Sequence, residues 1–228
     1  NKLQSDTLVE KVSSLGDIEA KLKSFGWYVD RCDGNDLTAF SKTLARALLI
    51  KDKPKIIIAD TIKGKGVSFM EHTSIDSDKA LYKFHSGAPS RDSYLKAVQE
   101  LIDSANSKLT NLGSELLELE LVHKDSSLTT PPENPQRLIQ AYSKELIKQA
   151  SKNHKIVALD ADLILDTGLI PFKEKFPDRF VECGIAEQDM VSQAGGMALQ
   201  GLIPVVHSFA CFLSARPNEQ IYNNATEK

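Results

Sequence analysis

The sequence contains few cysteines and no long apolar run. Only three of its 228 residues are cysteine, and no two of them form a C-x-x-C pair. This odd, widely spaced set fits neither a disulfide framework nor a zinc site, and it favours reduced thiols in a cytoplasmic protein. No apolar stretch approaches the roughly 20 residues that span a bilayer, so we expect no membrane partner.

The chain also has no strong excess of either charge. Its 28 basic and 31 acidic residues are interspersed and give a net charge of −3. Without a basic stripe to follow a phosphate backbone, nucleic acid is not an expected partner. No G-x-G-x-x-G follows an expected strand, so a nicotinamide-binding domain is only weakly supported. The hydrophobic share of 41% is enough for one large or two small cores.

Alternating strand and helix patterns predict an α/β protein. Residues 26–32 have a strand pattern, and a turn signal over 33–36 leads to a helix over 37–50 that Asp36 caps. The β-branched run at 56–59 is typical of a strand buried on both faces. Strand, helix and strand with short connections form a βαβ unit and hence a parallel sheet. Residues 155–159 predict a further buried strand.

The clearest linker pattern in the chain is the stretch SSLTTPPENP, which lies within residues 125–135. It divides the sequence into two parts. We therefore expect one domain over residues 1–107, a linker over 108–135 and a second domain over 136–228.

The most informative stretch begins at residue 179 and reads RFVECGIAEQDM. It predicts a strand, a tight turn at a glycine and then a helix of small and apolar residues. Glu187 falls in the first turn of that helix, where unpaired amide groups and the helix dipole favour a carboxylate. Taken alone, Glu187 is an ordinary first-turn acid.

The surroundings of Glu187 resemble a known family. GIAEQDM at 184–190, with HSFACF at 207–212, resembles the pyrimidine-binding domain of the transketolase and 1-deoxyxylulose-5-phosphate synthase family of thiamine diphosphate enzymes. FGW at 25–27, DGND at 33–36 and HSGAP at 85–89 resemble the transketolase diphosphate domain. The resemblance implies a parallel-sheet α/β thiamine diphosphate-binding fold in two incomplete domains: the end of a diphosphate domain, a linker and the start of a pyrimidine-binding domain.

This resemblance implies roles for residues of the second half. Glu187 would be catalytic and cofactor-binding, because the matching glutamate hydrogen-bonds N1′ of the aminopyrimidine and promotes loss of the thiazolium C2 proton. Phe209 and Phe212 would form the aminopyrimidine pocket, with Phe212 stacking on the ring. Arg137 would bind the substrate phosphate, and Asp162 would face the substrate.

In the first half, the resemblance assigns Ile62, in the loop TIKGKG, to cofactor binding. His85 would serve as a catalytic and substrate-binding residue by hydrogen bonding and proton transfer to sugar hydroxyls. The side-chain oxygen of Asn1 and the backbone carbonyl of Leu3 would bind Mg²⁺ or Ca²⁺. The aspartate that completes this metal site lies upstream in the family, so we expect the fragment to hold metal poorly. His72 has no such context, and we expect it to face solvent.

The resemblance implies transfer of a two-carbon ketol unit between sugars by a homodimer whose active site lies between subunits. The first residue is Asn rather than Met, and the last helical pattern has no stop signal, so we expect a piece of a longer protein that is inactive alone. Three departures from transketolase are Asn35 for a histidine, which we interpret as neutral for the turn, Ala215 for a tyrosine, and Asp166 near the position of a phosphate-binding serine.

Two alternatives stay open. The stretches DTGL and FPDRF favour a 1-deoxyxylulose-5-phosphate synthase-like enzyme that uses pyruvate, and Asp166 would repel a phosphorylated sugar. A cofactor-free dimerisation or regulatory subunit could also keep the fold. Binding of thiamine diphosphate would separate this last alternative from both enzymes.

Overall fold

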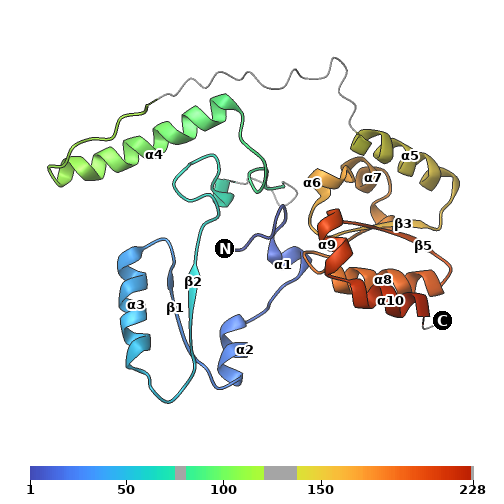
Figure 1. Cartoon of the computed structure of the whole chain (residues 1–228), viewed down its shortest axis with the longest axis horizontal. Coiled ribbons are helices and arrows are strands. Elements are labelled where there is room, and N and C mark those ends of the chain that lie inside the picture. Colours follow the sequence, from blue (N-terminus) through green and yellow to red (C-terminus); the bar gives the residue numbers. More distant parts are fainter. Residues whose placement is uncertain (75–80, 121–137, 227–228) are drawn as a thin grey trace. The chain divides into compact units, whose positions relative to one another are not determined.

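A computed structural model describes residues 1–74, 81–120 and 138–226 (Figure 1). The chain divides into two compact units. The first comprises Asn1–Leu3 and Leu15–Asp125, and the second comprises Gln4–Ser14 and Ser126–Lys228. Each unit is described by itself. The predicted domain boundaries at 107/108 and 135/136 stay predictions.

The first unit is built on a βαβ motif, as predicted. Strands β1 (Tyr28–Asp33) and β2 (Lys55–Asp60) pair in parallel, and helix α3 (Leu37–Leu49) connects them and packs beside them (Figure 1). The side chain of Asp36 accepts hydrogen bonds from the backbone nitrogens of Thr38 and Ala39, at 2.8 and 3.1 Å. These bonds satisfy two of the amides that a helix leaves unpaired at its start, which confirms the predicted cap.

The prediction that β2 is buried on both faces is wrong for this chain. Its central isoleucines are only half-buried, and both of its ends are exposed. The described part of this sheet has two strands, too few to bury a strand fully. The apolar run of β2 therefore indicates the burial that the strand would have in a larger sheet. Its observed burial is smaller because β1 and α3 are its main packing neighbours among the described residues.

The remaining helices of the first unit follow the sequence signals. Helix α2 (Ile18–Ser24) is capped by Asp17, and α4 (Arg91–Asn111) is capped by Ser90 through its hydroxyl. A short 3₁₀ helix, η1, covers His72–Ser74. Helix α4 continues four residues into the predicted linker, and most of that linker lies outside the described residues.

The second unit contains a parallel sheet of three strands in the order β4-β3-β5. Central strand β3 (Ile156–Asp160) is buried throughout, as predicted, between β4 (Phe180–Glu182) and β5 (Ile203–His207). The helical segments of this unit are α1 (Val9–Val12), α5 (Leu138–Lys152), α6 (Ile164–Thr167), α7 (Ile170–Lys175), η2 (Pro177–Arg179), α8 (Glu187–Leu199), α9 (Ala210–Ala215) and α10 (Asn218–Thr226).

Helix α8 packs against β3 and β5 and lies beside α10 (Figure 1). Its apolar face forms a core with the strands, made by the buried residues Val157, Leu159, Ala161, Cys183, Met190 and Ala194. Burial of this face fixes the rotation of α8 and hence the direction of Glu187, its first residue.

The predicted turn before α8 is present, and it depends on a glycine. Gly184 has φ of 72°, a conformation that side chains other than glycine rarely adopt. A Cβ atom there would lie 2.8 Å from Cγ1 of Val12 and 3.0 Å from Oε1 of Gln4. Residues 4–14 therefore lie directly against this turn. Their place in the second unit was not apparent from the sequence.

Candidate functional site

The carboxylate of Glu187 is buried at the start of α8. The residue is 4% exposed, and its Oε1 accepts a hydrogen bond of 2.6 Å from Nη1 of Arg216. The N-cap residue of α8, Ala186, makes no side-chain hydrogen bond to the amides of the first turn. These amides and the helix dipole therefore add to the stabilisation of a negative charge there. The predicted first-turn position is thus confirmed, and Arg216 is a partner that sequence analysis missed.

The two predicted aromatic residues lie together near α9. Phe209 precedes the helix and Phe212 lies within it, with ring centroids 5.6 Å apart at 46°. The guanidinium carbon of Arg216 lies 3.7 Å from the ring centroid of Phe212. Arg216 therefore joins Glu187 to Phe212 and brings the three residues into one cluster.

A hollow of about 320 Å³ opens beside this cluster, at the lower end of the range for small-molecule sites. Its lining is formed by the first turn of α8 and by Arg216, namely Ile185, Ala186, Glu187, Gln188, Asp189 and Arg216. The hollow itself presents the carboxylate of Glu187 and the cation of Arg216, and the Phe212 ring lies against that cation. Together these three groups suit a planar group with hydrogen-bonding nitrogens.

A second polar group lies where the strands of the second unit end. Asp160 pairs with Glu182 on one side and His207 on the other in the sheet register. Oε1 of Glu182 accepts hydrogen bonds from the backbone nitrogens of Asp162 and Gly184, at 2.8 and 3.0 Å. Asp160 accepts from the nitrogen of Leu163 at 2.7 Å and from the hydroxyl of Thr167 at 2.9 Å.

Burial raises the pKa of three carboxyl groups in this region. The pKa of Asp160 rises to about 6, and those of Glu182 and Asp6 rise to about 7. Removal from water is the largest cause in each case, and neighbouring carboxylates add to it. These groups can therefore hold or release a proton near neutral pH.

Asp162 is fully buried and contacts the backbone of residues 4–14. Its Oδ2 accepts hydrogen bonds from the nitrogens of Asp6, at 2.8 Å, and Thr7, at 3.4 Å. Its Oδ1 is buried without a hydrogen-bond partner among the described residues. The structure thus gives Asp162 an anchoring contact, and its predicted contact with substrate stays a prediction.

His207, the last residue of β5, is buried. Its Nδ1 lies 3.0 Å from the carbonyl oxygen of Leu159, and its Nε2 lies 2.6 Å from the hydroxyl of Tyr142. Burial lowers the pKa of His207 and raises that of Tyr142. The histidine is therefore neutral at pH 7 and fixes the end of β5, from which Phe209 follows.

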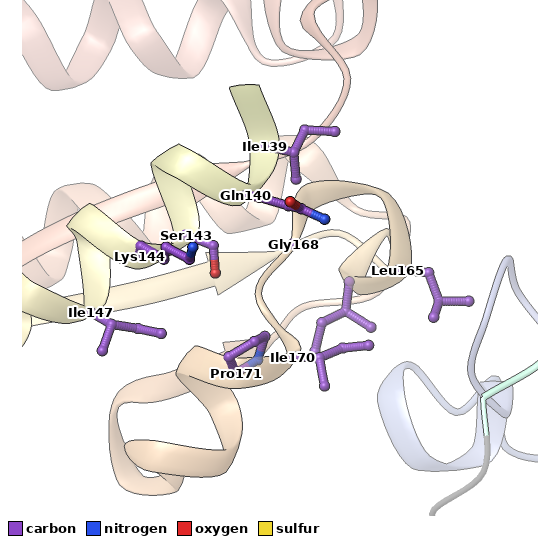
Figure 2. A pocket seen from close by; sticks show the side chains of 10 residues that line it. Ile139, Gln140, Ser143, Lys144, Ile147, Leu165, Gly168, Ile170 and Pro171 are labelled. Carbon is purple, nitrogen blue, oxygen red and sulfur yellow. The ribbon is translucent and has the colours of Figure 1, made fainter. Parts of the chain in front are cut away.

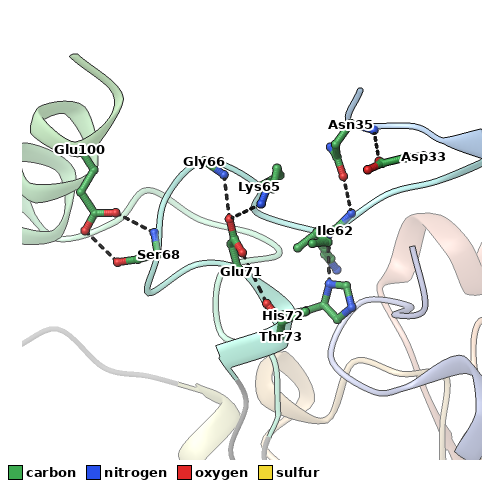
Figure 3. Close-up of polar contacts among 11 residues, drawn as sticks. Asp33, Asn35, Ile62, Lys65, Gly66, Ser68, Glu71, His72, Thr73 and Glu100 are labelled. Atoms are coloured by element: carbon green, nitrogen blue, oxygen red, sulfur yellow. Dashed lines mark hydrogen bonds and ion pairs between the residues drawn. The ribbon is translucent and has the colours of Figure 1, made fainter. Parts of the chain in front are cut away.

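In the first unit, the loop that carries Ile62 is held by polar contacts (Figure 3). The backbone nitrogen of Ile62 donates to Oδ1 of Asn35 at 2.8 Å, and the nitrogen of Lys63 donates to Nδ1 of His72 at 3.0 Å. The prediction that His72 faces solvent is wrong, because its ring is half-buried against this loop. Asn35 likewise does more than permit a turn, since its side chain orients Ile62.

The other predicted residues of the first unit differ in exposure: Asn1 lies at the surface, whereas Leu3 is buried. Asn1 accepts a hydrogen bond from the nitrogen of Leu3 at 3.0 Å through Oδ1. His85 is exposed, next to a hollow of about 410 Å³ lined by its neighbours Phe84 and Ser86 and by residues 87–90. Among the described residues, no group of three His, Cys, Asp or Glu side chains could hold a metal. Arg137 lies outside the described residues.

A further hollow of the second unit, of about 710 Å³, is lined by none of the predicted site residues. It lies between α5 and the α6–α7 segment and is mostly apolar (Figure 2). Its polar side chains come from α5, namely Gln140, Ser143 and Lys144. Asp166, in α6, is half-buried and contributes to the raised pKa of Asp6.

Comparison with known proteins places this geometry in a family. The transketolase thiamine diphosphate-binding domain matches residues 1–85, and the transketolase pyrimidine-binding domain matches residues 135–228. The chain belongs to the transketolase family. It is a two-part α/β thiamine diphosphate-binding fold with parallel sheets, as the motifs at Glu187 and at His85 predicted.

Individual relatives agree with this assignment. Transketolase-like protein 2 of Mus musculus is 31% identical over 201 residues, which are 86% of this chain and 31% of that protein. The 1-deoxy-D-xylulose-5-phosphate synthase of Thermomicrobium roseum is 37% identical over 108 residues, 46% of this chain and 17% of that protein. This chain thus spans about a third or less of the length of these relatives.

Among solved structures, a chain of a split-gene transketolase, described as an inactive β4 tetramer, is 42% identical. The match covers 37% of this chain and 28% of that chain, with a TM-score of 0.35. At that score the superposition adds nothing to the sequence match. Within the described residues, no helix is both long and apolar enough to cross a membrane.

Proposed function

We propose that this chain forms part of a thiamine diphosphate-dependent enzyme that transfers a two-carbon ketol unit between sugars in the cytoplasm. The observation that carries the proposal is the buried carboxylate of Glu187 at the start of α8, within one cluster with Phe212. The family match over both parts of the chain supports it.

The residues of the cluster fit the aminopyrimidine of thiamine diphosphate. A planar nitrogen-bearing group, the Arg216 guanidinium, already contacts both the Glu187 carboxylate and the Phe212 ring beside the hollow. When bound, the cofactor supplies a nucleophilic carbon that accepts the ketol unit. Glu187 holds the proton at its carboxyl oxygen and hydrogen-bonds N1′, while Phe212 and Phe209 present apolar faces to the ring.

The first unit supplies the other contacts in this proposal. Ile62, oriented by Asn35, would pack against the cofactor. His85 would hydrogen-bond to the sugar hydroxyls and exchange protons with the sugar oxygens. Asn1 and the carbonyl of Leu3 provide oxygen ligands to Mg²⁺ or Ca²⁺, together with groups outside this chain.

In the second unit, Arg137 binds the substrate phosphate, and Asp162 faces the substrate. The assembly is a homodimer with the active site between subunits. Such a site requires the complete protein, so we expect the chain alone to be inactive.

A second candidate is a synthase-like reaction with pyruvate as donor. The 37% identity to a 1-deoxy-D-xylulose-5-phosphate synthase, over about half of this chain, favours it. Asp166 also favours it over a reaction of phosphorylated donors, if this carboxylate faces the substrate, because it would repel a phosphate. A cofactor-free dimerisation or regulatory subunit is the third candidate. It would have the same fold as the two enzymes, but it would not require the carboxyl group of Glu187.

Two measurements on the full-length protein separate these candidates. Thiamine diphosphate with Mg²⁺ should raise the thermal unfolding temperature, since a ligand that binds the folded state stabilises it. Ketol transfer is then assayed with phosphorylated and unphosphorylated sugars, with pyruvate in parallel. Absence of any thermal shift at millimolar cofactor rejects both enzymatic candidates, and turnover with pyruvate alone rejects ketol transfer between sugars.

A further inference from the structure

Arg216 makes both of the interactions that the proposed function gives to the aminopyrimidine. Its Nη1 lies 2.6 Å from Oε1 of Glu187, and its guanidinium carbon lies 3.7 Å from the ring centroid of Phe212. A guanidinium and an aminopyrimidine are both flat and rich in nitrogen, so each can stack on a phenyl ring while it hydrogen-bonds to a carboxyl group. The two groups cannot occupy the same face of Phe212 at once.

The hollow beside Glu187 adjoins the position that the guanidinium of Arg216 occupies. Arg216 lines this hollow, and its guanidinium covers a face of the Phe212 ring. Withdrawal of the Arg216 side chain would therefore expose that face of the ring and release the carboxylate of Glu187. Both changes create the surface that an aromatic heterocycle needs.

The backbone of Arg216 is held at both of its polar groups. Its nitrogen donates to the carbonyl oxygen of Phe212 at 2.9 Å, and its carbonyl accepts from Nε2 of Gln188 at 3.2 Å. The side chain, in contrast, is 41% exposed, whereas that of Glu187 is 4% exposed. The guanidinium can therefore rotate toward water without movement of α8 or α9. Its charge is then hydrated rather than left without a partner.

In its present position Arg216 also stabilises the chain. A carboxylate as buried as that of Glu187 is costly to leave without a partner. The arginine supplies a charge-assisted hydrogen bond to it. The pair thus maintains the cluster in the absence of the cofactor, and it opposes a ligand that needs the same two partners.

We propose that Arg216 is an internal competitor of the aminopyrimidine, which occupies the position between Glu187 and Phe212 in the free chain and leaves it when thiamine diphosphate binds. This inference rests on the proposed function. It assigns Arg216 a role in setting cofactor affinity: the side chain stabilises the free protein and weakens cofactor binding.

The test compares full-length wild type with Arg216→Met, which keeps the apolar stem but lacks the planar cation. Calorimetric titration with thiamine diphosphate and Mg²⁺ should give a Kd about tenfold lower for Arg216→Met, and the cofactor-free variant should unfold at a lower temperature. Arg216→Lys keeps the charge but not the flat stacking surface, so its Kd should fall about threefold. Lys173→Met removes another cation above a phenylalanine ring, that of Phe180, and serves as the matched control with an unchanged Kd.

Inorganic diphosphate with Mg²⁺ is the second probe, because it has no ring. Wild type and Arg216→Met should bind it equally. Weaker diphosphate binding by the variant would make Arg216 an anion contact and overturn the inference. A Kd for thiamine diphosphate that is unchanged or higher in both Arg216 variants, with binding by wild type intact, overturns this inference alone. Wild type that binds no thiamine diphosphate overturns the proposed function and this inference with it.

Discussion

The side chain of Asp162 accepts a hydrogen bond from the backbone nitrogen of Asp6, 156 residues earlier in the chain. Asp162 itself has φ of 57°, and in the described residues it is the one residue besides glycine with a positive value. A buried carboxylate thus fixes the segment over residues 4–14 to the end of β3, and it does so from a backbone conformation that aspartate and asparagine tolerate better than most residues.

Asp162→Ala should therefore destabilise the protein more than Asp162→Asn. Alanine removes the acceptor for the nitrogens of Asp6 and Thr7 and must still adopt a positive φ, which together should lower the free energy of unfolding by about 3 kcal/mol. Asparagine keeps an oxygen acceptor and tolerates the conformation, so we expect a loss of about 1 kcal/mol. Urea unfolding of both full-length variants checks the order, and equal losses would contradict it.

Stability should fall as the pH rises from 5 to 8. Burial raises the pKa of Asp6 from 3.8 to about 7, so the folded chain binds more protons than the unfolded chain between these values. This contribution is fully present below pH 3.8 and is lost as the pH rises through 7. Asp160 and Glu182 act in the same direction.

Asp6→Asn isolates one of these groups. Its free energy of unfolding should fall between pH 5 and 8 by roughly 2 to 3 kcal/mol less than that of wild type, measured from urea unfolding at each pH. Asp178→Asn, at an exposed position of the same unit, is the control and should show the wild-type pH dependence. If the free energy of unfolding of Asp6→Asn fell as much as that of wild type, Asp6 would have its ordinary pKa in the folded chain.

Two glycines of the first unit share a positive φ but differ in the space around them, so substitutions there distinguish conformational strain from steric overlap. Gly26 and Gly64 have φ of 82° and 80°, but a Cβ at Gly26 has no atom within 4 Å, whereas one at Gly64 would overlap the carbonyl oxygen of Met70. Gly26→Ala should cost about 1 kcal/mol from the left-handed conformation alone. Gly64→Ala should cost roughly 3 kcal/mol or more, because backbone atoms must also move. Thermal unfolding of the two variants compares these losses of stability. Similar losses would mean that the backbone of the loop after β2 can move at little cost to admit a Cβ atom at position 64.

The sequence predicted local features well. The Asp36 cap and the glycine turn before Glu187 depend on residues within a few positions of one another, where side-chain chemistry and backbone conformation decide the outcome. The burial of β2 was wrong, because burial depends on neighbouring strands rather than on the strand itself.

Contacts between distant residues account for what sequence analysis missed. Arg216 reaches Glu187 across 29 positions, and Asn35 reaches Ile62 across 27. No periodicity links such positions. The packing of α8 against β5 brings Glu187 near Arg216, and the parallel pairing of β1 with β2 brings Asn35 near Ile62. One signal was available: Asp160, Glu182 and His207 each end a parallel strand, and such ends meet at one sheet edge. The raised pKa values of Asp160 and Glu182 arise at that edge, where both carboxyl groups are buried close to one another.

The sharpest prediction concerns the proton that the proposed function assigns to Glu187. Glu187→Gln keeps the size of the side chain and an oxygen that can accept from Nη1 of Arg216, but it has no carboxyl proton to give. Turnover of the full-length enzyme should fall by roughly 10²- to 10⁴-fold, the range for removal of a general acid.

Glu187→Asp shows whether position as well as acidity matters. It retains the proton one methylene further from the hollow, so its turnover should lie between those of wild type and Glu187→Gln. Cofactor binding measured in parallel separates chemistry from affinity, since an effect on turnover at saturating thiamine diphosphate cannot arise from weaker binding. Wild-type turnover in Glu187→Gln would remove Glu187 from the mechanism, whatever its place beside Phe212.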